Sequence, residues 1–176
     1  QMCIRDSACT APVELQIGEL AASLTSGKRS GVVLCGTCGN GKTTMMRAFQ
    51  NLLNVLRLPD DYHKKTYGIP VVNAGHIAHL CRSDYERFLN LCNTEMLGID
   101  DMGTEPLEVQ EFGNIHRPMV DLLTKRYENG TFTFITTNLV PQQIRDLYGE
   151  RIADRLNEMA DKIIFKNPSF RSWRHG

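Results

Sequence analysis

The chain alternates between short apolar runs and longer segments in which apolar residues recur every three or four positions. Short apolar runs are typical of buried strands, and the wider spacing is typical of amphipathic helices. The pattern predicts strands at residues 32–35, 69–74, 96–101, 131–137 and 162–165. It predicts helices at residues 15–24, 42–57, 77–82, 85–93 and 115–123, from Pro141 and over 152–159, with loops at 59–68 and 102–111.

Strands that alternate with helices in this way predict an α/β fold with a parallel sheet covered by helices on both faces. In such sheets, ligands bind beyond the carboxyl ends of the strands. Gly36, Asp100 and Asn138 each lie at the end of a predicted strand. We therefore expect these three residues to meet at one edge of the sheet.

The segment between the first strand and the next helix fits the phosphate-binding P-loop pattern G-x-x-x-x-G-K-[ST]. Glycines let successive backbone N–H groups wrap a polyphosphate, and the helix N-terminus favours an anion. Lys42 is expected to reach the β- and γ-phosphates, and Thr43 to bind Mg²⁺. The predicted ligand is a polyphosphate, held by Gly36, Thr37, Cys38, Gly39, Asn40, Gly41, Lys42, Thr43 and Thr44. The alternative is a glycine turn that only caps a helix.

Two carboxylates follow the third predicted strand, in the Walker B position after a P-loop. Asp100 is expected to hold the magnesium ion, and Asp101 to orient or deprotonate the attacking water. Many ATPases have glutamate at the second position, so Asp101 is one methylene shorter. Glu105 is a further candidate acid. Asn138 could position water near the γ-phosphate, whereas the alternative is a turn or helix-cap residue before Pro141.

Arg151 and Arg155 lie four residues apart on one predicted helix and therefore share a face. One interpretation is an arginine finger, which stabilises the charge of a transferring phosphoryl group. The other is a salt-bridged surface, because Asp154 and Glu158 are close in sequence.

Composition narrows the class of protein only a little. The formal net charge is zero, so attraction to nucleic acid would require a local basic patch. No apolar run is long enough to span a bilayer, and no secretory signal is evident, so we expect a cytoplasmic protein with no membrane partner. The six cysteines fit a reducing compartment. Cys35 and Cys38 form a C-x-x-C, but no second pair follows, which argues against a zinc site.

The first residues, QMCIRDS, resemble translated sequencing-adaptor read-through rather than a native start. We therefore treat residues 1–9 as a non-native leader and residues 10–176 as one ATPase domain. On this interpretation a partner-binding domain precedes the chain in the natural protein.

Several motifs together resemble the helicase-loader ATPases of the DnaC family, which belong to the AAA+ class. They are GTCGNGKTT, LGIDDMG, FITTNL, YGERIADRLNEM and NPSFR, in this order along the chain. The IstB-type helpers of transposition share much of the pattern. The resemblance covers roughly residues 30–172. It implies a three-layer P-loop fold with sheet order 5-1-4-3-2, in which the Asn138 strand lies between the P-loop strand and the Asp100 strand.

The resemblance also assigns roles to matching residues. Asn138 matches the first sensor residue, Arg155 the finger that acts on a neighbouring subunit, and Arg171 a nucleotide-sensing arginine of the C-terminal tail. It further implies binding of single-stranded DNA between the P-loop and the Asp100 strand. The candidates there are Lys64, Lys65, His76, His79, Arg82, Tyr85 and Arg87, since cations near aromatic rings suit a groove that follows a nucleic-acid backbone.

The expected function is a Mg·ATP-binding switch that hydrolyses ATP slowly, self-associates with ATP and loads a replicative helicase onto single-stranded DNA. Three alternatives stay open. The first is an IstB-like helper that works with a transposase, and the second is a nucleotide-gated DNA-binding module with negligible hydrolysis. The third, a small-molecule kinase, is disfavoured because no arginine-rich lid is evident and Asn138 would have no role.

Overall fold

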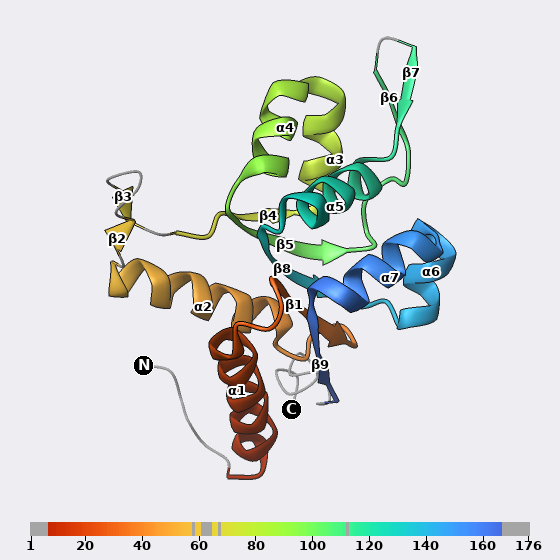
Figure 1. Cartoon of the computed structure of the whole chain (residues 1–176). Helices are drawn as coiled ribbons and strands as arrows, with labels where there is room; N and C mark the ends of the chain where they lie inside the picture. Colours follow the sequence, from red (N-terminus) through yellow and green to blue (C-terminus); the bar gives the residue numbers. More distant parts are fainter. Residues whose placement is uncertain (1–6, 58, 61–64, 67, 112, 167–176) are drawn as a thin grey trace.

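A five-stranded parallel sheet forms the centre of the fold in a computed structural model of the chain (Figure 1). Its strands are β1 (Gly31–Gly36), β4 (Val71–Asn73), β5 (Met96–Met102), β8 (Phe132–Thr137) and β9 (Asp161–Phe165). They lie in the order β4-β5-β8-β1-β9. Counted in chain order, these five strands read 5-1-4-3-2 from the β9 edge. The structure describes residues 7–57, 59–60, 65–66, 68–111 and 113–166, with side chains at 12–57, 68–110 and 113–166.

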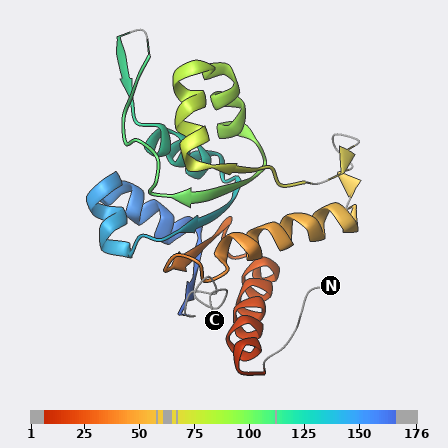
Figure 2. The same ribbon diagram turned by 180° about the vertical axis from the view of Figure 1, so that it is seen from behind.

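Helices cover both faces of the sheet, as the alternating pattern predicts. On one face, Val32 and Leu34 of β1 contact a cluster that includes residues of α1 (Ser7–Ser26) and α2 (Lys42–Leu56). On the other face, Val33 and Cys35 join a larger cluster. The helices of that face are α3 (Ala74–Ser83), α4 (Tyr85–Asn93), α5 (Pro118–Asn129), α6 (Pro141–Tyr148) and α7 (Glu150–Met159). Figures 1 and 2 show the three layers from two sides.

Some element boundaries differ from the sequence-based predictions. Helix α1 begins at Ser7, inside the segment that the sequence analysis leaves out of the domain. Strand β4 is shorter than predicted, because the helix that follows it starts at Ala74. The side chain of Asn73 accepts a hydrogen bond from the Gly75 N–H at 2.9 Å and so caps that helix.

Two short hairpins lie in or next to the regions predicted as loops, and β7 lies beyond residues 102–111, where the predicted helix was expected to begin. They are β2 (Pro59–Asp60) with β3 (Lys65–Thr66), and β6 (Val109–Glu111) with β7 (Asn114–His116). The prediction that Ile115 belongs to a helical stripe is wrong, since Ile115 lies in β7 and is 69% exposed. Helix α5 starts at Pro118, and Arg117 before it has φ −111° and ψ 86°. A residue before proline avoids the helical region, so the helix cannot extend back to Ile115.

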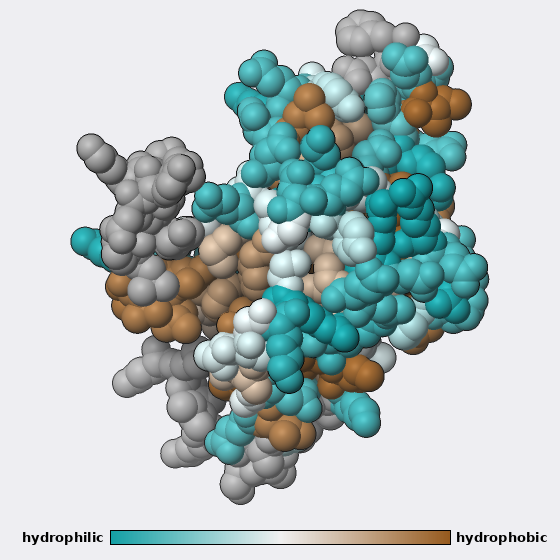
Figure 3. Space-filling view, in the orientation of Figure 1, coloured by the Kyte–Doolittle hydropathy of each residue, from teal (hydrophilic) through white to brown (hydrophobic). Residues whose placement is uncertain are grey.

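The surface view shows apolar side chains over the part of α2 that lies far from the P-loop (Figure 3). Leu52, Val55 and Leu56 of this helix are exposed. In the part of the chain that the structure describes, no helix has both the length and the apolar character to cross a membrane.

Candidate nucleotide-binding site

The P-loop connects β1 to α2, as its motif predicts, and its glycines are needed for close backbone contacts. A Cβ on Gly36 would lie 2.4 Å from the Phe165 carbonyl oxygen of β9 and 2.5 Å from the Asn40 side chain. Gly41, directly before α2, has φ 98°, which side chains rarely allow. The loop therefore places the first N–H groups of α2, which have no partners within the helix, at the sheet edge.

Lys42 lies under the loop rather than in solvent, with only 5% of its surface exposed. Its Nζ lies 2.7 Å from the carbonyl oxygens of both Gly36 and Thr37, 3.0 Å from Asn40 Oδ1 and 2.8 Å from Asn138 Oδ1. Burial lowers the pKa of Lys42, and the negative charge of Asp101 opposes that shift. A phosphate bound in the loop could therefore replace these oxygens as acceptor of the hydrogen bonds that the ammonium group donates.

An open pocket of about 640 Å³ lies over the P-loop. This volume is in the range of small-molecule sites. Residues from the loop, the start of α2 and the ends of β5 and β8 line it: Cys38, Gly39, Asn40, Gly41, Lys42, Thr43, Thr44, Asp101, Thr104 and Asn138. Gly36 and Thr37 hold Lys42 in place, because their carbonyl oxygens accept hydrogen bonds from its Nζ. The structure thus brings together the P-loop, the second carboxylate and Asn138, which are far apart in sequence.

Thr43 and Asp100 form a pair suited to a magnesium ion. The Thr43 hydroxyl donates a hydrogen bond to Asp100 Oδ1 at 2.9 Å, and Asp100 is 8% exposed. Hydroxyl and carboxylate oxygens are the hard ligands that Mg²⁺ prefers, and the ion usually takes one or two protein carboxylates together with substrate phosphates. The donor set therefore fits the predicted ion, with Thr43 and Asp100 as its holders.

Asp101 and Asn138 face the pocket from neighbouring strands. Asp101 has φ 58°, a left-handed conformation that is uncommon for residues other than glycine. Asn138 follows β8, and its Oδ1 accepts the hydrogen bond from Lys42. Both side chains lie where a water molecule beside a bound phosphate could be oriented.

Glu105 does not join this site. It is 6% exposed, and its Oε2 accepts a hydrogen bond from the Gly103 N–H at 2.8 Å. Its Oε1 accepts one from the Tyr148 hydroxyl of α6. Burial and the Glu105 carboxylate both raise the pKa of Tyr148. Among the described residues, those that line the pocket do not include Glu105, so this side chain fixes the loop after β5 against α6.

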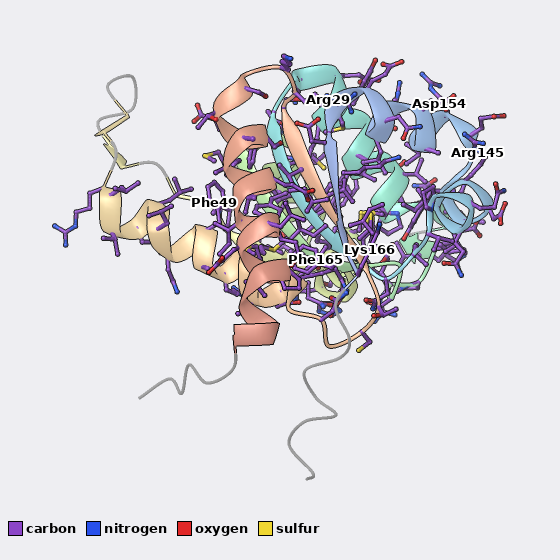
Figure 4. The ribbon with its side chains drawn as sticks, turned by 90° about the horizontal axis from the view of Figure 1, so that it is seen from below. Arg29, Phe49, Arg145, Asp154, Phe165 and Lys166 are labelled. Atoms are coloured by element: carbon purple, nitrogen blue, oxygen red, sulfur yellow. The ribbon has the colours of Figure 1, made fainter. Side chains whose placement is uncertain are left out.

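Of the arginine candidates, Arg151 and Arg155 lie on α7 and are not among the described residues that line the pocket. Arg155, on α7, has its guanidinium 5.0 Å from the centre of the Tyr127 ring and 3.4 Å from Glu128 Oε1, both on α5. Arg151 is exposed on the same helix. In Figure 4, Arg145 and Asp154, which mark α6 and α7, lie on the opposite side of the molecule from Phe49 of α2. Arg171 lies outside the described residues.

Most of the described DNA-binding candidates are exposed, Arg87 included, and Tyr85 is packed. His76, His79 and Arg82 are exposed on α3. Arg87 pairs with Asp84 at 3.2 Å, and Tyr85 stacks on Phe88 with 5.6 Å between ring centres. Lys64 and the side chain of Lys65 lie outside the described part of the chain.

The cysteines of the P-loop strand give no sign of a zinc site. Cys35 is buried in β1 and Cys38 is exposed. Within the described residues, no three histidine, cysteine, aspartate or glutamate side chains converge as metal ligands would.

Sequence reasoning missed the role of the Asn40 side chain. Asn40 is 1% exposed, and its Nδ2 donates a hydrogen bond to the Phe165 carbonyl oxygen at 3.0 Å. The side chain therefore ties the P-loop to the end of β9, which Figure 4 marks with Phe165 and Lys166. A polar residue inside a glycine loop is the only sequence signal for this contact.

Comparisons with solved structures show the fold. No protein-family model matches the chain, and no curated protein matches it. Among solved structures, the DnaC helicase loader superposes with a TM-score of 0.64 at 20% identity, covering 94% of this chain and 95% of that one. DnaI gives 0.64 at 18% identity, covering 94% and 88%. DnaA from Aquifex aeolicus, bound to AMPPCP, gives 0.60 at 17% identity, covering 96% of this chain and 50% of that one.

The fold is therefore that of a P-loop NTPase of the AAA+ class. Within this class it is a DnaC-like AAA+ fold.

Proposed function

We propose that the chain binds Mg·ATP and uses slow ATP hydrolysis as a conformational switch. The observation that carries this proposal is the meeting of Lys42, Thr43, Asp101 and Asn138 around one pocket, with Asp100 bonded to Thr43 beside it. This set supplies a phosphate-binding cation, two oxygen ligands for magnesium and two groups that can orient water. These are the parts on which phosphoryl transfer to water depends.

The geometry supports a division of labour among these residues. Lys42 would exchange its bonds with the Gly36 and Thr37 carbonyls for bonds to the phosphates, together with the N–H groups at the start of α2. Thr43 and Asp100 would hold Mg²⁺, which neutralises phosphate charge when bound. Asp101 and Asn138 would orient the attacking water, and the Asp101 carboxylate would accept its proton.

The partners belong to the same proposal. The likeness to the DnaC helicase loader supports a role in loading a replicative helicase onto single-stranded DNA in the cytoplasm, and a helper of a transposase stays the alternative. ATP would promote a homo-oligomer in which Arg155 of one subunit completes the site of the next. Arg171 would sense the nucleotide from the C-terminal tail.

A second candidate is a nucleotide-gated binding module with negligible hydrolysis. The side chain of Asp101 favours this second candidate, because it is one methylene shorter than the glutamate of many ATPases. The left-handed backbone of Asp101 fixes the point from which this shorter side chain must reach the water. Phosphate release measured with and without single-stranded DNA separates the two functions. Turnover that rises with DNA supports the switch, and none in either condition supports the module.

Titration of a fluorescent ATP analogue tests the nucleotide site. We expect the Lys42→Ala protein to show no binding at concentrations that saturate the native protein, because it loses the buried cation. Lys125→Ala, an exposed lysine on α5, serves as the matched control and should bind as the native protein does. Native-like binding by Lys42→Ala would refute the assignment of the pocket.

A further inference from the structure

The ladder between β5 and β8 contains an irregularity at the two aspartates. Ile99 pairs with Ile135, but the next pair is Met102 with Thr137, so β5 has one residue more than β8 in this interval. Asp101, inside the interval, is left-handed with φ 58°. A β-bulge of this kind re-aims side chains and takes the extra residue out of the regular ladder. Asp101 can therefore face the pocket although it lies within β5.

One buried hydroxyl of β8 supports this bulge. Thr136 is 0% exposed, and its Oγ1 accepts a hydrogen bond from the Asp101 N–H at 2.9 Å. The same oxygen lies 2.6 Å from Asp100 Oδ1. Since the backbone N–H must be the donor in the first contact, the hydroxyl proton is available for the carboxylate. Thr136 therefore satisfies the N–H of the bulge and orients Asp100 at the same time.

Asp100 Oδ1 is thus held from two sides. Thr43, at the start of α2, donates to it at 2.9 Å, and Thr136 donates from the neighbouring strand. Groups that orient a metal ligand set its direction and basicity, and their loss typically weakens metal binding. Thr136 lies two residues before Asn138, so β8 contributes both a buried support and a residue of the pocket.

We propose that Thr136 is a positioning residue of the magnesium-nucleotide site. It holds Asp100 toward Thr43 and fixes Asp101 at the edge of the pocket, without contacting the nucleotide itself. This inference rests on the proposed function, since it concerns magnesium bound with ATP. It goes beyond that function because it makes the Mg²⁺ dependence of nucleotide binding rely on Thr136, which belongs neither to the P-loop nor to the two aspartates.

The test measures how magnesium strengthens binding of a fluorescent ATP analogue, first in EDTA and then along a Mg²⁺ titration. For Thr136→Val, which keeps the shape and removes the hydroxyl, we expect the Mg²⁺ requirement to rise roughly 10- to 100-fold. Binding in EDTA should stay within about twofold of native. Thr136→Ser restores the hydroxyl and should restore the native Mg²⁺ response.

Thr133→Val is the matched control, because it removes another buried hydroxyl from the same strand. That hydroxyl accepts a hydrogen bond from Arg126 Nε at 2.9 Å, so the control also loses packing stability but should keep the native Mg²⁺ response. If Thr136→Val does not fold, Thr136→Cys replaces it with the same expectation. A native Mg²⁺ response in the folded variant, or an equal loss in the control, overturns the proposal for Thr136. Absence of nucleotide binding by the native protein would instead overturn the proposed function, and this inference with it.

Discussion

Arg126 is a fully buried charge that no functional motif includes. Its guanidinium donates hydrogen bonds to the Thr133 hydroxyl and to four carbonyl oxygens, those of Leu91, Cys92, Thr94 and Phe132. Leu91 and Cys92 lie in the last turn of α4, where the helix dipole favours a cation. Burial lowers the pKa of Arg126 to about 10, so the group stays charged near neutral pH. One side chain of α5 therefore joins α4 and β8.

We predict that Arg126→Met lowers the free energy of unfolding by about 2–4 kcal/mol, although methionine fills much of the same space. The cause is the loss of donors to buried carbonyl groups, which costs more than the relief of burying a charge. Urea denaturation followed by circular dichroism measures the difference.

The control for this prediction is Arg145→Met, on the surface of α6. Arg145 pairs with Glu150 at 3.8 Å and Asp154 at 3.7 Å, with 43% of its side chain exposed. Exposed ion pairs contribute little, so this variant should differ from the native protein by less than about 1 kcal/mol. Equal stability of Arg126→Met and the native protein would show that the buried network is energetically neutral.

The contrast between Lys42 and Arg126 shows which residues a sequence can identify. The role of Lys42 is predicted by the P-loop motif, because the spacing of its glycines and lysine is what a phosphate-binding loop requires. The burial of Arg126 was not predicted, although it continues the apolar stripe of Met119, Leu122 and Leu123 at helical spacing. A charged residue on such a stripe is ambiguous, because only the tertiary structure brings the carbonyls of α4 to it. The role of Thr136 is harder still to predict from sequence, because its hydrogen bond with the Asp101 N–H depends on the bulge between β5 and β8.

At the scale of elements, α3 comes between the P-loop and β5 in the chain and exposes its polar side to solvent. The rings of His76 and His79 stack with 6.1 Å between centres, and Arg82 is exposed further along the same helix. Tyr85, at the start of α4, packs against Phe88 and His116. The outer side of α3 is therefore a better candidate for contact with a nucleic-acid backbone than the packed ring of Tyr85.

We predict that Arg82→Ala weakens binding of labelled single-stranded DNA and flattens its salt dependence. The loss of one phosphate contact reduces the slope of log affinity against log salt by about 0.7 for a single strand. Fluorescence anisotropy at several salt concentrations measures both quantities.

Arg47→Ala is the matched control for DNA binding, because Arg47 is an exposed arginine of α2, which covers the other face of the sheet. It should leave affinity and slope unchanged. If Arg82→Ala binds DNA with native affinity and native slope, this side of α3 is not the DNA-binding surface.

The five parallel strands could be predicted because each contains a short apolar run, buried on both faces in β1, β5 and β8, and most helices because each buries one apolar stripe. The short hairpins could not. The β6–β7 hairpin replaces a predicted loop, and Ile115 within it is exposed, so no buried stripe marks the element. The start of α5 was set instead by Pro118, a local backbone constraint that apolar spacing does not contain.

At the scale of the whole molecule, the proposed role of Arg155 in the site of a second copy can be tested against its contacts within one chain. Its side chain is 12% exposed and rests on Tyr127 and Glu128 of α5, so it does not serve the pocket of its own chain. Among the described residues, nothing accepts a hydrogen bond from its buried Nη1. To reach a neighbouring subunit's nucleotide, the guanidinium would have to leave its contacts with Tyr127 and Glu128.

We predict that Arg155→Ala binds the ATP analogue with native affinity but loses the rise of turnover per chain with protein concentration. Its pocket residues are intact, whereas the cation that it would offer to the next subunit is absent. Phosphate release along a protein dilution series measures the effect. Arg151→Ala, four residues earlier on the same helix and exposed, is the control for loss of a positive charge from α7.

A mixing experiment separates this role from a structural one. Lys42→Ala subunits cannot hold ATP but keep Arg155, and Arg155→Ala subunits hold ATP but lack the finger. If Arg155 acts across the interface, the mixture should hydrolyse ATP faster than either protein alone, because one subunit completes the site of the other. If Arg155 only packs α7 against α5, mixing restores nothing, and the loss of turnover should instead follow the loss of thermal stability. Full turnover by Arg155→Ala alone would remove it from the mechanism.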